Sequence, residues 1–442
     1  MAARHFKDSD DASSRIEASS ASRVAQAQAA AEATVAMQNA DDAAEEAVVT
    51  ERVPATDVEG SSDVYGLVNK HTHNHRRRRR KGSSSKHRNR ALPILGGVLV
   101  LVFGILCAGA VWMAHLNRSL SMGDEAEAVT GALVSEEEAA VEVQNDGFYV
   151  LLVGSDAREG DTFSRGDVLM LARIDPTNHV VTLVSIPRDT MVSIAGAVGT
   201  QKINATYAFG GASEAVYEIS KFAGVPISHY AEIDFEGLKH VVDLLGGVWV
   251  DVPEAVSLTQ TSTGSLAAGP QMLDGETALA YARERYSASG GDFGRAQAQR
   301  LIVQAIIRQT MQAGPAKLPG LINNLAACIT TDYTVTDLLS LAMQFQGQKT
   351  TIYSAVCPSY ALWQDGVSYV GTMFDEWRDM MKRVDAGLDP NDTSVEIPEP
   401  QASSEKLGKA ENSEAPKDYK DLAANSMSTN SVAPTDNTTT ID

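Results

Sequence analysis

Histidine and cysteine are scarce in this chain of 442 residues, which limits the kinds of site that it can build. The three cysteines, Cys107, Cys328 and Cys357, form no CxxC pair and no other spacing typical of zinc binding. Only three of the nine histidines lie in the region that we expect to fold, which argues against a histidine-based triad or metal site. Positive charge is also limited. The chain has 37 Lys and Arg against 57 Asp and Glu, and this balance argues against a general nucleic-acid binder.

Both ends of the chain lack the large apolar residues that a packed core needs. Residues 1 to about 70 are rich in Ala, Ser, Asp and Glu, with almost no aromatics, and residues 388–442 are rich in Ser, Thr, Asn, Glu and Pro. Such segments bury too little apolar surface to offset the entropy of ordering. We therefore predict disorder at both ends.

One long apolar run separates a basic segment from an acidic one. Residues 91–114 carry no charge, and about 20 apolar residues suffice to span the hydrocarbon core of a membrane. The run begins too far from Met1 for an ordinary cleaved signal peptide. The segment 71–90 before it contains Arg76 to Arg80, and acidic residues follow it, so the positive-inside rule places the N-terminus in the cytoplasm. The arginines are then a topology signal that also attracts anionic lipid, rather than a nucleic-acid site.

This pattern predicts a single-pass membrane protein with its main domain outside the cell. We expect a cytoplasmic region over 1–90, a transmembrane helix over 91–114, a polar spacer over 115–146 and a folded domain over 147–387. Within that domain apolar runs and helical periodicities alternate, which predicts an α/β domain with its sheet covered on both faces. The strands are expected at 148–153, 168–174, 180–186, 248–252 and 351–356, and the helices at 212–222, 235–245, 275–286, 318–328, 336–345 and 371–384.

Charged residues gather where the predicted strands end. The first strand runs into Asp156 and Arg158, the second follows Arg165 and Asp167, and the third runs into Arg188. Open α/β sheets commonly place their ligand crevice at such strand ends. Two neighbouring aspartates without a nearby histidine suit Mg²⁺ rather than Zn²⁺. The alternative is that these charges only pair with one another as a structural network.

A second group of charges lies between Ala278 and Arg300. A helix is predicted to end near Tyr286 at a Ser/Gly-rich break, and a second helix follows with Asp292 as its N-cap. Arg295 and Gln299 then share a face at i, i+4, and the break allows Arg283 and Arg285 to converge on one ligand. Guanidinium groups beside a helix N-terminus suit a phosphate or pyrophosphate. Solvated surface arginines are the alternative.

Seven motifs in this order extend the argument beyond single residues. They are GSDAR, RGD, IPRDT, QKINATYAFGG, DFEGLKHVVDLLGGVWVDVP, LDGETALAYARERY and GDFGRAQAQ, and they span Gly154 to Gln299. The series resembles the LytR-CpsA-Psr family of membrane-anchored envelope proteins. That resemblance implies a three-layer α/β/α domain with a central mixed sheet. It also implies a Mg²⁺-dependent phosphotransferase that moves a glycopolymer, such as teichoic acid or capsule, from a polyprenyl-pyrophosphate carrier to peptidoglycan, or occasionally to a protein.

The resemblance also implies roles for individual residues. Asp156 and Asp167 match the magnesium-site aspartates, Asp292 matches an aspartate beside the arginines, and Arg295 and Gln299 match head-group contacts. The residues that would hold the pyrophosphate are Arg165, Arg188, Arg283 and Arg285. Arg188, Arg283 and Arg285 would also take part in catalysis, together with Asp156 and Asp167. In the family, the motif GDFGR is commonly followed, two residues later, by Arg-Gln-Gln. This chain has Ala298, Gln299 and Arg300 at those three positions.

The chemistry leaves several alternatives open. Either Asp156 or Asp167 can accept the proton of the acceptor hydroxyl. Candidates to line a slot for the polyprenyl tail, each of which can equally be an ordinary core residue, are Tyr207, Phe209, Phe222, Phe235, Leu238 and Val242. Because disulfides persist outside the cell, we predict a bond between Cys328 and Cys357, with free buried thiols as the alternative. Besides the transferase, a pyrophosphatase and a non-catalytic regulator that binds lipid carriers remain possible functions.

Overall fold

The structure is a computed structural model that describes residues 110–134, 147–155, 166–258, 264–285, 290–314, 316–326, 328–429 and 438–441. No helix within these ranges is long and apolar enough to cross a membrane. The predicted membrane helix lies outside the described residues, apart from 110–114, which are helical.

The elements described below are numbered along the chain. The strands are β1 (Phe148–Ser155), β2 (Gly166–Asp175), β3 (Val180–Ile186), β4 (Met191–Val192), β5 (Gln201–Lys202), β6 (His229–Asp234), β7 (Val248–Val252), β8 (Val256–Ser257), β9 (Ser265–Leu266), β10 (Gly269–Leu273), β11 (Ile329–Thr331), β12 (Thr350–Val356), β13 (Ser359–Gln364), β14 (Val367–Thr372) and β15 (Thr438–Ile441). The α-helices are α3 (Ala126–Ala132), α5 (Thr206–Ala223), α6 (Phe235–Leu244), α7 (Gly275–Arg283), α8 (Asp292–Gln312), α9 (Leu318–Leu325), α10 (Val335–Phe345), α11 (Phe374–Asp385), α12 (Glu399–Ala402) and α13 (Lys420–Ala424), with short 3-10 turns η1 (Gly123–Glu125) and η2 (Ile203–Ala205).

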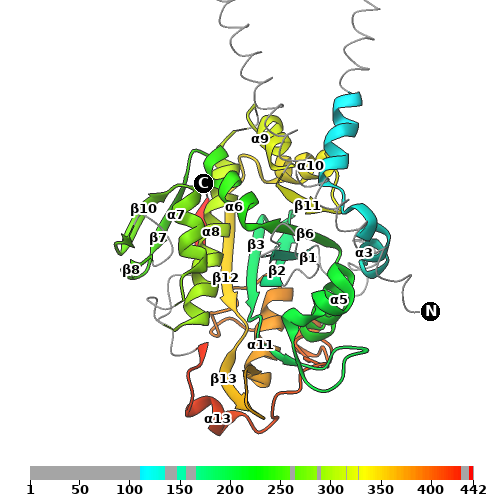
Figure 1. The fold of residues 1–442 in the computed structure, drawn as a ribbon, viewed down its shortest axis with the longest axis vertical. Helices are drawn as coiled ribbons and strands as arrows, with labels where there is room; N and C mark the ends of the chain where they lie inside the picture. Colours follow the sequence, from blue (N-terminus) through cyan, green and yellow to red (C-terminus); the bar gives the residue numbers. More distant parts are fainter. Residues whose placement is uncertain are drawn as a thin grey trace, which may run out of the picture. The chain divides into compact units, whose positions relative to one another are not determined.

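A seven-stranded mixed sheet forms the centre of the domain, in the order β11-β6-β1-β2-β3-β12-β15 (Figure 1). β1, β2 and β3 are antiparallel neighbours, whereas β6 runs parallel to β1 and β12 runs parallel to β3. The four long apolar runs predicted as strands at 148–153, 168–174, 180–186 and 351–356 are all in this sheet. Their near-continuous apolar sequence fits strands that are buried on both faces.

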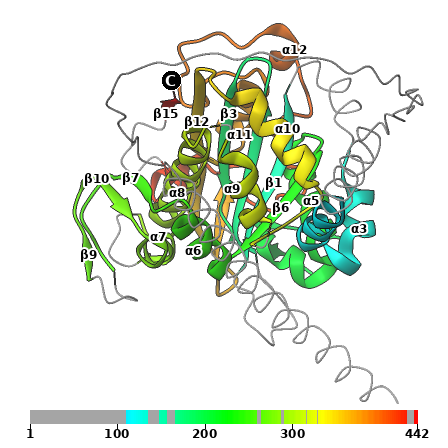
Figure 2. The same ribbon diagram turned by 90° about the horizontal axis from the view of Figure 1, so that it is seen from above.

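Helices cover both faces of the sheet, which confirms the predicted α/β/α layering. Leu151, Leu171 and Val184 project into a core with residues of α5 and α11. On the opposite face Val150, Met170 and Leu183 pack with residues of α8 and α10. Figure 1 shows α8 and α5 on either side of the central strands, and Figure 2 shows α9 and α10 lying over the strands beside α8.

Two hairpins stand outside the central sheet. β7 pairs with β10, and β13 pairs with β14, both antiparallel. The prediction of a helix over 371–384 was wrong at its start, because Gly371 and Thr372 end strand β14 and α11 begins at Phe374. A Cβ atom at Gly371 would lie 2.4 Å from the Tyr360 ring, so this strand position needs glycine.

The folded domain begins well before residue 147, which corrects the prediction of a polar spacer over 115–146 for its described part, residues 115–134. Leu116 and Leu120 are buried against Ile322 and Val335. The Asn117 side chain accepts a hydrogen bond of 3.1 Å from the backbone N–H of Val335. Leu116 and Leu120 are spaced i, i+4, as on one face of a helix, but the polar residues between them gave no sign that this face packs on the domain.

The C-terminal segment also packs on the domain, so the prediction of a disordered tail over 388–442 was wrong for the described residues 388–429 and 438–441. Leu407 and Ala410 are buried in the same core as α5. A Cβ atom at Gly224, whose φ is +70°, would lie 1.9 Å from the Lys406 carbonyl oxygen. The contacts are mostly backbone and polar, such as the 3.0 Å bond from the Asn412 amide to the Glu218 carbonyl, and composition does not reveal them.

The predicted Cys328–Cys357 disulfide was also wrong, because both thiols are free. Cys328 precedes β11 and Cys357 follows β12, and four strands separate these two in the sheet. Neighbouring strands are about 4.8 Å apart, so the two cysteines lie several times too far apart for the Cα separation of a disulfide. Burial raises the pKa of the Cys328 thiol to about 11.

Candidate active site

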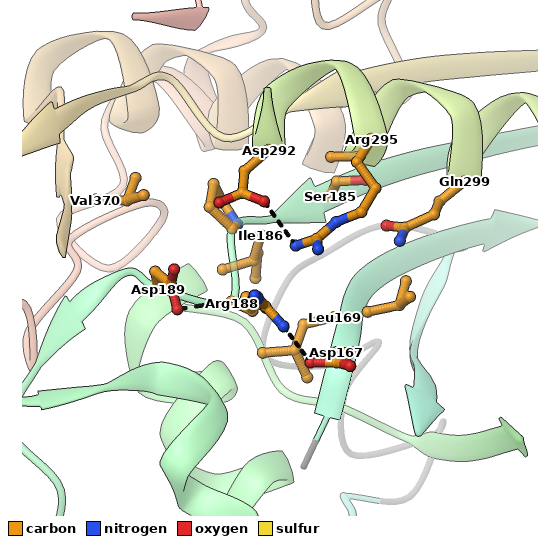
Figure 3. Close-up of a pocket in the computed structure, with 13 residues that line it drawn as sticks. Asp167, Leu169, Ser185, Ile186, Arg188, Asp189, Asp292, Arg295, Gln299 and Val370 are labelled. Carbon is orange, nitrogen blue, oxygen red and sulfur yellow. Dashed lines mark hydrogen bonds and ion pairs between the residues drawn. The ribbon is translucent and has the colours of Figure 1, made fainter. Parts of the chain in front are cut away.

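Two strand ends place an arginine and three other charged residues together. Arg188 follows β3, and its Nη1 lies 2.5 Å from Oδ1 of Asp167, the second residue of β2 (Figure 3). Arg188 also lies beside Asp189, whose carboxylate contacts Lys202 at 3.2 Å. Because β2 and β3 are antiparallel, the beginning of one and the end of the other share one edge of the sheet. The predicted gathering of charges at this edge is confirmed for Asp167 and Arg188.

The break between α7 and α8 brings a second set of charges to the same edge. The break contains Gly291, with a φ of +57°, and this glycine is the N-cap of α8. Asp292 is the first residue of α8, and its side chain does not cap the helix as predicted. Instead its carboxylate lies 3.0 Å from Nη2 of Arg295 and 3.3 Å from Nη2 of Arg285. Asp292 thus holds two arginines at the start of α8.

The two sets of charges interact electrostatically. Burial lowers the pKa of Arg295, and the positive charges of Arg188 and Arg285 act in the same direction, against the opposing effect of Asp292. Burial also tends to lower the pKa of Arg188. The negative charges of Asp167, Asp189 and Asp292 together have a larger effect, so the pKa of this guanidinium is raised. Both arginines lie in a partly desolvated place, where the attraction between a guanidinium group and an anion is stronger than in water.

These side chains line a small pocket, which we call the charged pocket. Figure 3 shows Arg188 at its centre, between Asp167 and Asp189, with Asp292, Arg295 and Gln299 projecting from α8. The full lining is Asp167, Val168, Leu169, Ser185, Ile186, Pro187, Arg188, Asp189, Asp292, Arg295, Ala296, Gln299 and Val370. Arg188, Arg295 and Gln299 can donate hydrogen bonds to an anionic head group, and the carboxylates around the same cavity hold the arginines in place.

The remaining predicted site residues lie at different distances from this pocket. Gln299 lines it and donates a hydrogen bond of 3.1 Å to the Ala282 carbonyl. Arg283 does not line it, and its guanidinium lies over the Phe235 ring at 4.8 Å. Asp156, Arg158 and Arg165 are outside the described residues, so the structure does not place them.

The two departures from the family pattern both point away from the charged pocket. Ala298 is buried in a core with residues of α6, α7 and β7. Arg300 is buried on the sheet side of α8, and its Nε donates a hydrogen bond of 3.0 Å to the Ser354 hydroxyl. Arg300 therefore does not replace an arginine at position 298.

A second pocket adjoins the first and is almost wholly apolar; we call it the apolar pocket. Its lining is Leu152, Val153, Gly154, Val168, Met170, Ile233, Asp234, Phe235, Leu238, Ala282, Gln299, Ile302 and Val303. Val168 of β2 and Gln299 of α8 line both pockets, so the charged and apolar pockets adjoin each other. This arrangement suits an amphiphilic ligand.

Only two of the six residues proposed for a lipid slot line the apolar pocket, namely Phe235 and Leu238. Phe222, on α5, and Val242, on α6, are fully buried core residues that do not line this pocket. Tyr207 packs against the core, where its hydroxyl is hydrogen-bonded to Tyr230, and Phe209 is 48% exposed. The structure therefore supports the core alternative for Phe222 and Val242.

Sequence reasoning missed several residues of the charged pocket. Asp189 directly follows Arg188 in the IPRDT motif, so the motif itself held this signal. Its ion-pair partner Lys202, which does not line the pocket, lies in the QKINATYAFGG motif. Val370 and Ser185 also line the pocket, but no motif marks them. Val370 lies far along the chain from the other lining residues, and Ser185 lies within a predicted strand. Among the described residues, no group of three or more His, Cys, Asp and Glu side chains could hold a metal ion.

The domain is a mixed sheet between two helical layers, and a pocket lined by two arginines lies beside an apolar one. This arrangement defines an α/β protein suited to an amphiphile with an anionic head. The chain belongs to the LytR_cpsA_psr family, whose model matches residues 117–385. It is 31% identical over 281 residues to the polyisoprenyl-teichoic acid–peptidoglycan teichoic acid transferase TagU of Enterococcus faecalis, covering 62% of this chain and 89% of that protein. It is 32% identical over 262 residues to TagU of Halalkalibacterium halodurans, covering 58% and 82% of the two chains.

A solved structure has the same fold. A Streptococcus agalactiae protein, gbs0355, superposes with a TM-score of 0.52 at 22% identity, over 65% of this chain and 98% of that one. The family match begins at residue 117, which agrees with the packing of Leu116 and Leu120 on the domain.

Proposed function

We propose that this protein is a phosphotransferase that moves a glycopolymer from a polyprenyl-pyrophosphate carrier to peptidoglycan. The observation that carries the proposal is that the charged pocket adjoins the apolar pocket, with Val168 and Gln299 lining both. A polyprenyl pyrophosphate has an anionic head joined to an apolar chain, in the same order as the two pockets. The named activity of the TagU relatives supports the same reaction.

Arginines supply the main electrostatic contribution to this reaction. The acceptor hydroxyl oxygen attacks the phosphorus that carries the glycan, the bond to the bridging oxygen breaks, and polyprenyl phosphate leaves with the electron pair. Negative charge grows on the bridging oxygen, and Arg188 and Arg295 are positioned to stabilise it. Asp167 and Asp292 hold these two side chains before the ligand arrives.

The proton of the acceptor hydroxyl needs a base at the same edge of the sheet. Asp167 is a candidate, because its carboxylate lines the charged pocket and is 22% exposed. Asp156, which follows the end of β1, is the other candidate by resemblance to the family. Either carboxylate would take the proton directly from the attacking oxygen.

We further propose Mg²⁺ as the cofactor. The carboxylates that line the charged pocket are Asp167, Asp189 and Asp292, and no His or Cys accompanies them among the described lining residues. Oxygen ligands of this kind fit Mg²⁺, which commonly binds one or two carboxylates together with substrate phosphate. Asp167, with Asp156, would hold the ion, and when bound it would neutralise charge on the phosphate oxygens.

The proposed location is the outer face of the cell membrane. The apolar run 91–114 would anchor the chain with its N-terminus in the cytoplasm, and the domain from residue 117 onwards would meet its donor and acceptor outside. Peptidoglycan is the proposed acceptor, with an envelope protein as the alternative, and membrane lipid is a further contact.

The proposal is tested with the full-length protein in detergent, a polyprenyl-pyrophosphate glycan and short peptidoglycan strands, with and without Mg²⁺. We expect glycan joined to peptidoglycan only with Mg²⁺ present and Arg188 intact. Release of free glycan phosphate in place of joined polymer would indicate a pyrophosphatase. Failure to bind any polyprenyl pyrophosphate would overturn the assignment.

A further inference from the structure

We propose that Trp363, on the β13–β14 hairpin, is a stacking platform for a sugar ring of the glycan carried on the pyrophosphate. This inference rests on the proposed function and adds a carbohydrate subsite to it. Trp363 is 72% exposed, the largest exposed fraction of any described aromatic side chain. Exposure alone does not indicate a ligand site. The position of Trp363 relative to the charged pocket does.

The hairpin is joined to the charged pocket by its strand β14. The backbone N–H of Val370 donates a hydrogen bond of 2.8 Å to the Asp189 carbonyl, and the Val370 side chain lines the pocket. Val370 pairs with Ala361, and Ser368 pairs with Trp363. Directly opposed residues of an antiparallel pair, and residues two apart on one strand, share a face. Trp363 therefore lies on the same face as Val370, about 7 Å farther along the hairpin.

Three surfaces then follow one another in a fixed order. The apolar pocket meets the charged pocket at Gln299, and the charged pocket is bounded on another side by Val370. Figure 3 shows Gln299 and Val370 on opposite sides of Arg188. Beyond Val370 the hairpin face leads to Trp363. The order of apolar, cationic and aromatic surfaces matches the order of prenyl chain, pyrophosphate and sugar in the proposed donor.

The chemistry of the hairpin face suits a sugar ring. A tryptophan presents a broad, electron-rich face that attracts the polarised C–H groups of a flat, amphipathic ligand. Ser368, directly opposite Trp363 on β14, lies on the same face and offers a partner for a hydroxyl group. The face carries no basic residue between Val370 and Trp363, which favours a neutral ring over a further phosphate.

The opposite face of the hairpin is fixed by the C-terminal segment. Tyr360 and Leu362 pack with Tyr419 and Ala423 of that segment. The backbone N–H of Ala361 also donates a hydrogen bond of 2.7 Å to the carbonyl of Met427. This segment lies beyond residue 385, where the family match ends. It holds the platform rigid, which lowers the entropy lost when a ligand binds.

The experiment measures two affinities of the full-length protein in detergent. One ligand is a prenyl pyrophosphate that carries a single N-acetylhexosamine, and the other is the same prenyl pyrophosphate without sugar. We expect the wild type to bind the sugar-bearing ligand more tightly. Trp363→Ala should weaken binding of that ligand about five- to tenfold and leave the sugar-free ligand unchanged. Trp363→Phe should recover part of the loss.

Trp249→Ala is the matched control, because Trp249 is 49% exposed on the other hairpin and lines neither pocket. We expect it to change neither affinity. Equal binding of both ligands by the wild type, or an equal loss for both ligands in Trp363→Ala, would overturn the platform. Failure of the wild type to bind even the sugar-free ligand would instead overturn the proposed function, so the two failures are distinguishable.

Discussion

The charged and apolar pockets differ in whether their lining side chains are already paired with one another. In the charged pocket each cation already has a carboxylate partner: Asp167 holds Arg188, and Asp292 holds Arg295. In the apolar pocket the lining side chains, such as Leu238 and Ile302, leave a cavity with no built-in competitor. An anionic head group must therefore compete with aspartates, whereas an apolar chain only displaces water.

This difference predicts that the two pockets respond differently to substitution. Changes in the charged pocket should act mainly on the rate of the chemical step, because the paired arginines are preorganised for charge that develops in the transition state. Changes in the apolar pocket should act mainly on affinity, because a prenyl chain is bound equally before and during the reaction.

The largest expected effect is that of Arg188→Ala. Removing one preorganised donor to a developing negative charge typically lowers the rate by about 100- to 1,000-fold. We expect a loss of this size in kcat for glycan transfer, measured with a labelled donor. Arg378→Ala, on the exposed side of α11, is the control and should retain full activity. A loss below tenfold for Arg188→Ala would remove this residue from the chemical step.

A smaller effect, and one of a different kind, is expected from Leu238→Trp. The larger side chain should fill the apolar pocket and raise KM for a long-chain donor about tenfold, with little change for a donor whose prenyl chain is short. Phe222→Leu is the comparison, since Phe222 is a core residue: it should lower the melting temperature and leave KM unchanged. An identical KM for both chain lengths in Leu238→Trp would contradict the assignment of this pocket.

Asp292→Asn tests the competition between carboxylate and ligand. The substitution removes the charge that holds Arg285 and Arg295, so kcat should fall about tenfold as the two guanidinium groups lose their fixed positions. Because a competing anion is removed at the same time, the affinity for the sugar-free pyrophosphate should not fall. Ligand titration and initial rates together check both parts, and a loss of affinity equal to the loss of rate would show that Asp292 does not compete.

The smallest effect on activity is expected from Arg300→Gln. Burial lowers the pKa of Arg300 to about 10, so the folded state binds this proton less readily than the unfolded chain does. Below pH 10 Arg300 is charged in both the folded and the unfolded state, and burying this charge costs free energy on folding. A neutral side chain should therefore stabilise the fold by about 1 kcal/mol or more at neutral pH. Transfer should stay within about twofold of the wild type. Urea unfolding at pH 7 measures the stability, and a less stable variant would show that Ser354 fully compensates the buried charge.

The sequence predicted those parts of the fold that have a strong local pattern. Continuous apolar runs located β1, β2, β3 and β12, and two strand ends with Asp167 and Arg188 located the charged pocket. The break before α8 and the shared face of Arg295 and Gln299 were also predictable, because both follow from local backbone geometry.

Other features depend on long-range packing that no local pattern records. Phe222 and Phe235 have the same apolar character, yet one is in a core and the other lines a pocket. The C-terminal segment is fixed by contacts such as those of Asn412 with Glu218, nearly two hundred residues away. The predicted disulfide between Cys328 and Cys357 rests on their oxidising compartment alone. The strand order, which the sequence does not reveal, separates the two cysteines.

The most direct test of the account is to locate both ends of one ligand on the full-length protein. A prenyl pyrophosphate with a photoreactive group near the end of its chain is bound, irradiated and mapped by peptide mass spectrometry, with Arg188→Ala as a comparison. We predict crosslinks to the peptides that contain Leu238 and Ile302, which are lost when excess unlabelled prenyl pyrophosphate is added and weakened in Arg188→Ala. Crosslinks that fall outside the apolar pocket, or that are unaffected by competitor, would contradict a single site for the amphiphile.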